Sequence, residues 1–404
     1  MKVGIQRPLI ASLLIGLIAL AAGCSSISEA DDQPARPEVV SEKKFTGDAR
    51  APKSIFVFHD GTRNDANSGT NVRKLFDAVV TANDPQAVAM YIEGVGSAST
   101  PLLGAGLGFG METRIRRGYD FISQSYRPGD AVYIFGFSRG AHSARALAGL
   151  IAYAGVPPAS TLAPEHRQRQ LNRIIEIVKD KDDADYLATW KSWTPAAGAP
   201  LAPQIRAAIG LSMQPVEIRF LGLWDTVPGS QLKKFGICKE LPAWPKGDRY
   251  KSDSYPPIRT IFHALSIDEK RSQFRPILLC DPINPAYTSR TEVWFPGAHA
   301  DVGGGYANST ELSNLSLHWM MAALRASGIA LPAPAPSLAN PLGLAHWSIG
   351  DAPGNFRSHC EDRILPAGAA PDPSVKQRTD AGSALLRINQ VEGMHPYPTR
   401  CPAR

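Results

Sequence analysis

The sequence has no run of lysine or arginine of the kind that follows a nucleic-acid backbone. Its 404 residues include 43 Lys and Arg against 37 Asp and Glu, and the formal net charge is only +6. A small and dispersed basic excess supports at most a weak attraction to anionic lipid. We therefore expect no nucleic-acid partner.

Cysteine is scarce, and no CxxC pair or Cys/His cluster indicates a zinc site. Apart from Cys24, the sequence has Cys238, Cys280, Cys360 and Cys401. In an exported chain, an even number of cysteines favours disulfides, and four allow three pairings. We expect at least one disulfide among these four, the alternative being that some are free and buried. We expect no metal and no other cofactor.

Near its start, the sequence has no apolar run long enough to span a membrane comfortably. The run Leu9–Ala22 has the length of a signal peptide, follows the basic residues Lys2 and Arg7, and ends in LAAGC. This pattern is typical of a bacterial lipoprotein signal. Residues 1–23 are then removed and Cys24 becomes the acylated first residue. The alternative is an ordinary secretory signal with a chance cysteine.

The residues after this cysteine predict a tethered enzyme. Ser25, rather than aspartate, follows the cysteine, which favours the outer membrane of the bacterial envelope over the inner one. Residues 24–52 are polar, with Pro, Ser and mixed charges, and read as a flexible tether. Residues 53–404 form the expected globular domain.

Apolar strands alternate with amphipathic helices from residue 53 onward. Strands are expected at 55–58, 87–92, 131–135, 217–223 and 291–295, and helices at 72–81, 111–126 and 139–154. Strands that are apolar throughout and alternate with helices indicate a mostly parallel central sheet with helices on both faces. The expected fold class is α/β.

Two further segments look helical. Residues 160–212 interrupt the alternation with charged helical sequence and a Pro/Ala-rich link, which predicts an insertion over the sheet and a candidate lid. Residues 263–271 also look helical. Beyond about residue 330 the Pro- and Ala-rich sequence predicts no clear element.

A GxSxG motif stands between the expected strand 131–135 and the expected helix 139–154. In Gly136-Phe137-Ser138-Arg139-Gly140 the serine occupies a tight strand-to-helix turn. This is the nucleophile elbow of α/β-hydrolases, in which the flanking glycines let strand and helix approach closely. Ser138 is the predicted nucleophile, the alternative being a plain glycine-rich turn.

A serine nucleophile needs a base, and the base needs an orienting carboxylate. In α/β-hydrolases these follow the serine in the order Asp or Glu, then His, on loops after strands. Asp225 and His299 both meet this condition. The alternatives are a turn or cap role for Asp225 and a structural role for His299.

The oxyanion hole is expected to use the backbone N–H of Arg139 and a second N–H from the loop after the first strand, at Asp60 or Gly61. In that loop His59 is a possible substrate contact. Asp301 is another.

A metal site is the rival interpretation of some of these residues. Asp60, His299 and Asp301 could together hold an ion. We rank this lower, because it would leave the Ser138 elbow without a purpose.

Five ordered segments carry a resemblance to a known family. They are FHDGTRN (58–64), GFSRGAHSAR (136–145), FLGLWDTV (220–227), HALSIDEKR (263–271) and WFPGAHADVGGGY (294–306). Over roughly residues 53–325 the chain resembles the α/β-hydrolase-like domain of bacterial type VI secretion lipase effectors.

The resemblance implies phospholipase activity with a triad at Ser138, Asp225 and His299, and membrane lipid as both substrate and anchor; protein partners stay unknown. Two features depart from the family: His59 stands where many members have another residue, and a lipoprotein signal is unexpected in an injected effector. Two alternatives remain. One is an esterase of soluble or cell-wall esters, and the other is a catalytically silent envelope protein that binds lipid or serves as an immunity factor.

Overall fold

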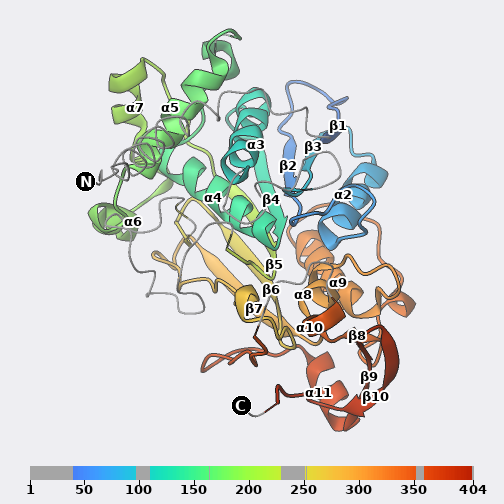
Figure 1. Cartoon of the computed structure of the whole chain (residues 1–404). Helices are drawn as coiled ribbons and strands as arrows, with labels where there is room; N and C mark the ends of the chain where they lie inside the picture. The colour runs from blue at the N-terminus through green and yellow to red at the C-terminus, as the bar shows by residue number, and fades with distance from the viewer. Residues whose placement is uncertain are drawn as a thin grey trace, which may run out of the picture. The chain divides into compact units, whose positions relative to one another are not determined.

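The computed structural model describes residues 40–96, 110–162, 164–228, 251, 253–351 and 359–402. A seven-stranded sheet with the order β1-β3-β2-β4-β5-β6-β7 forms its centre (Figure 1). The strands are β1 (Val40–Lys43), β2 (Ser54–His59), β3 (Ala87–Ile92), β4 (Ala131–Phe137), β5 (Ile218–Trp224), β6 (Thr260–Ser266) and β7 (Ser289–Phe295). All neighbouring pairs are parallel except β1 with β3. The expected mostly parallel sheet is confirmed.

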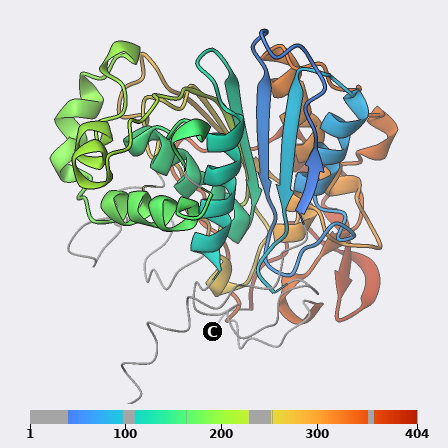
Figure 2. The same ribbon diagram turned by 90° about the horizontal axis from the view of Figure 1, so that it is seen from above.

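Helices cover both faces of this sheet, which is why its strands are apolar throughout. Along β2, Ile55 and Val57 join one hydrophobic core, while Phe56 and Phe58 join the other. The first core is covered by α3 (Met111–Ser125) and α4 (Arg139–Ala154), and the second by α2 (Asn71–Ala82) and α9 (Glu311–Ala326) (Figures 1 and 2). The three helices expected at 72–81, 111–126 and 139–154 are therefore confirmed, as α2, α3 and α4.

The expected tether is too long at its C-terminal end. Residues 40–43, assigned to it from their polar sequence, form the edge strand β1 and pair antiparallel with β3. The Lys43 ammonium is buried and donates to the backbone carbonyls of Asp84 and Ala87. A short polar edge strand of this kind gains its order from backbone pairing rather than from apolar burial, so composition alone misses it.

The segment 263–271 is not a helix. Its first four residues complete β6, which pairs in parallel with β5 and β7, and His263 lies within this strand. Ala264 and Leu265 favour a helix locally, but the preceding Thr260, Ile261 and Phe262 extend the segment into a strand-forming run. Pairing on both sides then decides the conformation over local propensity.

The candidate lid, residues 160–212, does contain helices. They are α5 (Arg167–Lys179), α6 (Leu187–Lys191) and α7 (Ala202–Ile209). Leu171, Ile174 and Ile205 from this segment are buried in the core that α3 and α4 share. The packed face explains the amphipathic pattern of α5, and a lid function stays a prediction.

The C-terminal part adds a second, three-stranded sheet in the order β10-β9-β8. Its elements, with the short helices near it, are α8 (His299–Gly303), β8 (Ala345–His346), α10 (Ser348–Asp351), α11 (Pro373–Asp380), β9 (Ser383–Ile388) and β10 (Val391–Pro396). A disulfide joins Cys360 to Cys401. Cys280 is disulfide-bonded too, while Cys238 lies outside the described residues. The expectation of at least one disulfide is confirmed.

In the part of the chain that the structure describes, no helix has both the length and the apolar character needed to cross a membrane. The predicted signal peptide and Cys24 lie outside the described residues.

Candidate active site

Ser138 occupies a strained turn between β4 and α4. Its backbone has φ 58° and ψ −127°, a conformation that an L-residue rarely adopts. The flanking glycines make the turn possible: a Cβ on Gly140 would lie 2.3 Å from the His59 carbonyl oxygen, and one on Gly136 would lie 2.4 Å from the Gly140 carbonyl oxygen. The sequence GxSxG therefore forms the expected elbow geometry around Ser138.

Asp225 and His299 come together beside this elbow. Asp225 directly follows β5, and His299 opens α8 after β7. The distance from His299 Nδ1 to Asp225 Oδ2 is 2.6 Å, and Asp225 is fully buried. The two residues that chain order predicts as a pair are thus hydrogen-bonded to each other.

Backbone and ring contacts join this pair to the elbow. The Ser138 N–H donates to the Trp224 carbonyl at 3.0 Å, and its carbonyl accepts from the Val227 N–H at 3.2 Å. These two residues flank the turn that carries Asp225. The ring of Phe137 packs on the imidazole of His299, with centroids 4.6 Å apart. Ser138, Asp225 and His299 therefore share one edge of the sheet, at the carboxyl ends of its strands.

The electrostatics give His299 the protonation state of a base. Burial alone would raise the pKa of Asp225, but the Arg363 guanidinium and the His299 contact hold that pKa well below its usual range. Burial also lowers the pKa of His299, against the opposite effect of Asp225. With an ionised Asp225 accepting from Nδ1–H, the neutral imidazole has its lone pair on Nε2.

Arg363 is the main residue of this site that the sequence did not reveal. Its Nη1 and Nη2 lie 2.6 and 2.9 Å from the two carboxylate oxygens of Asp225. The two residues are 138 positions apart, and Arg363 belongs to the C-terminal part, for which no motif was recognised. Cys360 lies three positions before it, but a cysteine predicts a disulfide and not a neighbouring arginine with a role in the site.

Two residues of the HALSIDEKR segment also support the pair. The Ser266 N–H donates to Asp225 Oδ1 at 3.0 Å, and Glu269 accepts from the His299 N–H at 3.2 Å. Glu269 in turn forms an ion pair with Arg271. Both contacts follow from the position of β6 between β5 and β7, because Asp225 comes after β5 and His299 comes after β7.

The loop after β2 differs from the expected oxyanion hole. The Gly61 N–H donates to the carboxylate of Asp60 at 2.7 Å, and the Asp60 N–H donates to the Ile92 carbonyl at 2.9 Å. Both expected donors thus already have acceptors within the protein, and their part in an oxyanion hole stays a prediction. Thr62 follows them, and its buried hydroxyl has no hydrogen-bond partner among the residues that the structure describes.

Asp60 has a structural role. Its second carboxylate oxygen accepts from the hydroxyls of Thr70 and Tyr91, each at 2.6 Å. Burial raises the pKa of Asp60 to about 6, although these hydrogen bonds oppose the shift. The carboxylate therefore holds the loop next to Ser138: a Cβ on Gly61 would lie 3.1 Å from the Ser138 Cβ.

Arg139 lies where the prediction places it. It is the first residue of α4, directly after Ser138. N–H groups in the first turn of a helix have no acceptor within that helix. Its role as an oxyanion donor stays a prediction.

His59 and Asp301 are both buried, and their role as substrate contacts stays a prediction. His59 is fully buried against α3, where a Cβ on Gly118 would lie 3.1 Å from its Nε2, and burial together with Arg114 lowers its pKa to about 3. Asp301 is buried as well and accepts from the backbone N–H of Ala298, which caps α8, and from that of His346. Neither position could be separated from a surface position by the motif alone.

The rival metal site has no support from these side chains. Asp60 contacts Thr70 and Tyr91, His299 contacts Asp225, and Asp301 lies 2.7 Å from Nδ1 of His346. Each candidate ligand thus has a separate partner. Among the residues that the structure describes, no three His, Cys, Asp or Glu side chains are grouped as metal ligands.

A cavity of about 420 Å³ is lined by residues that contact Asp225 and His299, although neither of these two side chains lines it. Its wall includes Glu269 and Arg363, which contact His299 and Asp225, together with Leu278, Trp294 and Ile364. It offers mixed apolar and charged surroundings next to the predicted reaction centre.

Parts of this chain are similar to known proteins. A curated relative, an uncharacterized protein of Saccharomyces cerevisiae, is 25% identical over 241 residues, which cover 55% of this chain and 32% of the relative. A solved structure of an uncharacterized protein from Pseudomonas aeruginosa is 18% identical, with a TM-score of 0.40 and coverage of 81% of this chain and 50% of that chain. The structure of the Tle1 effector bound to the VgrG spike of the type 6 secretion system is 20% identical, with a TM-score of 0.30 and coverage of 66% and 53%.

The chain thus spans about a third of the yeast protein and about half of these two solved chains. The family model of the catalytic domain of Tle1-like T6SS phospholipase effectors matches residues 53–323, which hold Ser138, Asp225 and His299. This range is more than half of the chain, and the protein belongs to the family of that catalytic domain.

Proposed function

We propose that the protein is a serine hydrolase that cleaves carboxylic esters of membrane phospholipids. The observation that carries this proposal is the buried hydrogen bond between His299 and Asp225 beside the strained turn of Ser138. Membership of the Tle1-like family supports phospholipid as the substrate class.

The reaction proceeds through an acyl-enzyme. His299 Nε2 takes the hydroxyl proton of Ser138 as Ser138 Oγ attacks the ester carbonyl carbon. The tetrahedral intermediate collapses, the C–O bond to the alcohol breaks, and His299 returns the proton to the leaving oxygen. Water, activated by His299, then hydrolyses the acyl-serine ester and releases the fatty acid. Asp225 holds the imidazole in the required tautomer and stabilises the imidazolium.

The oxyanion is stabilised by the first turn of α4 and by the loop after β2. Arg139 supplies a backbone N–H next to the nucleophile, and the helix N-terminus favours negative charge. Because Asp60 and Gly61 already donate elsewhere, Thr62 is the next residue of the loop that can contribute. Its buried hydroxyl, which has no partner among the described residues, supports this assignment.

The reaction takes place at the bacterial cell envelope, with membrane lipid as anchor and substrate. The apolar run and LAAGC at residues 20–24 support acylation of Cys24, and Ser25 supports the outer membrane.

Release of fatty acid from defined vesicles tests the proposal. Purified protein should hydrolyse phospholipid in vesicles, and Ser138→Ala should abolish the release. Hydrolysis of soluble short-chain esters without any release from vesicles would contradict phospholipid as the substrate. Absence of both activities in folded protein would contradict the enzyme assignment and favour a binding or immunity role.

A further inference from the structure

A single arginine from outside the family match contacts the predicted catalytic acid. Arg363 follows the matched residues 53–323, yet both of its terminal nitrogens contact the Asp225 carboxylate. Its side chain is 5% exposed and that of Asp225 is fully buried. A two-pronged contact of this kind fixes the plane of a carboxylate as well as its charge.

The same guanidinium also ties down the surroundings of the base. It donates to the Ser266 carbonyl at the end of β6 at 2.6 Å, and to the Phe274 carbonyl at 2.5 Å. The Phe274 ring stands edge-on to the imidazole of His299, with centroids 5.1 Å apart. Arg363 thus joins the acid, a strand end and a loop that packs against the base.

The backbone that carries Arg363 is attached to the domain by hydrogen bonds. The Ser272 N–H donates to the His359 carbonyl at 3.1 Å, and the Glu361 N–H donates to the Lys270 carbonyl at 2.9 Å. The Lys270 ammonium lies 2.6 Å from the Asp362 carboxylate. These contacts hold residues 359–362 against residues 270–272, and Arg363 follows directly.

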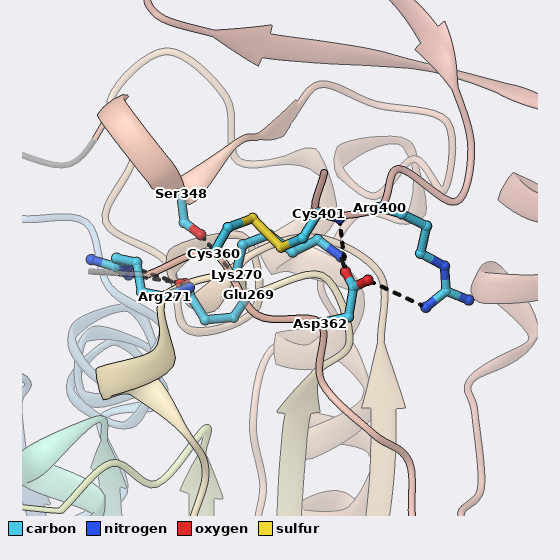
Figure 3. Close-up of a disulfide and its surroundings, with 8 residues drawn as sticks. All are labelled: Glu269, Lys270, Arg271, Ser348, Cys360, Asp362, Arg400 and Cys401. Carbon is cyan, nitrogen blue, oxygen red and sulfur yellow. Dashed lines mark hydrogen bonds and ion pairs between the residues drawn. A yellow bond between two sulfur atoms is a disulfide. The ribbon is translucent and has the colours of Figure 1, made fainter. Parts of the chain in front are cut away.

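The Cys360–Cys401 disulfide links residues 359–362 covalently to the C-terminal end of the chain. Figure 3 shows the disulfide beside Lys270, with Asp362 between Lys270 and the Cys401 end of the chain. Cys360 is only three positions before Arg363, and its backbone forms an isolated antiparallel β-bridge with that of Arg271. The covalent link therefore restrains the segment at the point where Arg363 leaves it.

We propose that Arg363 is a positioning residue for Asp225 and His299, and that the Cys360–Cys401 disulfide keeps it in place. The proposal rests on the hydrolase function proposed above. In this role Arg363 acts through the acid: it sets the orientation and charge of Asp225, and through Asp225 it acts on His299.

A charge effect separates this role from a purely structural one. The charged groups around His299 are Asp225, Glu269 and Arg271, and Arg363 acts through Asp225. Without Arg363, the Asp225 carboxylate is less neutralised and stabilises the imidazolium more strongly. Activity requires neutral His299, so its acidic limb should move to higher pH.

The test is the pH dependence of hydrolysis of a soluble short-chain ester by the full chain. Arg363→Met should lower kcat by up to about 100-fold, because small misplacements of a catalytic group cost that much. KM should change little, and the acidic limb should rise by roughly one pH unit. Arg363→Lys, which keeps the charge but not the two-pronged contact, should lie between wild type and Arg363→Met.

Arg378→Met is the matched control. Arg378 is also buried, but it donates to the backbone carbonyls of Pro341, Gly343 and Leu385. Its loss should lower the melting temperature without moving the acidic limb. The proposal is overturned if Arg363→Met leaves the limb at its wild-type position, or if Arg378→Met moves it equally. Should Arg363→Met fail to fold, Arg363→Gln, which also removes the charge, is measured in its place and held to the same criterion.

The disulfide is tested by the double variant Cys360→Ser/Cys401→Ser. It should move the limb in the same direction as Arg363→Met, and adding Arg363→Met to it should cost little more, because residues that act as a unit are non-additive. A double variant with wild-type kcat and limb overturns the disulfide's part. If wild-type protein hydrolyses no ester at all, the proposed function itself is refuted. If wild-type protein is active but Arg363→Met leaves the acidic limb of the pH profile in place, only the role of Arg363 is refuted.

Discussion

Asp225 is held from several sides: by the imidazole of His299, by the Ser266 N–H and by the guanidinium of Arg363. Asp225→Asn keeps the shape of this side chain but removes its charge and allows the wrong imidazole tautomer. We expect a loss of kcat on the order of 10⁴-fold. Ser138→Ala should cost about 10⁶-fold, because it removes the nucleophile.

Turnover of a soluble ester, measured in both variants under saturating substrate, checks this order. Equal losses would mean that Asp225 does more than orient and stabilise His299. A loss of less than tenfold in Asp225→Asn would show that another group holds the imidazole.

The pKa of His299 predicts how activity depends on pH. Burial lowers this pKa below its usual value of about 6.5, and the reaction needs the neutral imidazole. Activity should therefore fall only as the pH drops below about 6.5, and should be full at neutral pH. A kcat profile whose acidic midpoint lies above pH 7 would contradict a lowered pKa.

At the level of residues, the sequence was most informative where chemistry and chain order agree. Ser138, Asp225 and His299 each follow a strand in the order that the fold requires. Arg363 could not be found this way, because an arginine that neutralises a carboxylate has no local pattern. The burial of His59 against α3 could not be predicted for a related reason: a histidine at a strand end has the same local sequence whether it faces a site or a helix.

At the level of elements, the turn between β4 and α4 sets the position of Ser138. A methyl group at position 140 would lie 2.3 Å from the His59 carbonyl oxygen and 2.4 Å from that of Asp60. Gly140→Ala should push α4 away from β2 and lower the free energy of unfolding by about 1–3 kcal/mol. It should also slow the reaction of Ser138 with a fluorophosphonate.

Gly129→Ala is the control for this variant. Gly129 has φ 97° with nothing within 4 Å of a built Cβ, so alanine there strains the backbone without meeting a neighbour. It should lower stability but leave the rate of labelling unchanged. Equal labelling of Gly140→Ala and wild type would show that the close contact of α4 with the β2 loop does not position Ser138.

Strands that are apolar throughout were predictable, and β2 to β5 and β7 lie where the sequence places them. The failures came from elements whose order depends on distant partners. The second half of β6 has a helix-like local sequence, and β1 is too polar and short to be recognised as a strand. Each is specified by the neighbouring strand with which it pairs.

At the level of the whole molecule, an anchor would place the enzyme on its substrate. Acylation of Cys24 should keep the protein in the membrane fraction, and Cys24→Ser should release it, because the mature chain then lacks its lipid. Fractionation of cells with and without the substitution measures this. A Cys24→Ser protein that stays fully membrane-bound would show that another feature attaches it.

The soluble-ester activity of the released Cys24→Ser protein should equal that of wild type. In contrast, its activity on vesicles should fall because it is no longer concentrated at the lipid surface. A loss on soluble ester would mean that the substitution damages the domain itself.

The most direct measurement is the site and rate of covalent labelling by a fluorophosphonate. In wild-type protein, peptide mass mapping should find one adduct, on Ser138, and His299→Ala should slow its formation by orders of magnitude because the hydroxyl then lacks its base. An adduct on another residue, or equal labelling of wild type and His299→Ala, would contradict the assignment of Ser138, His299 and Asp225 as one catalytic unit.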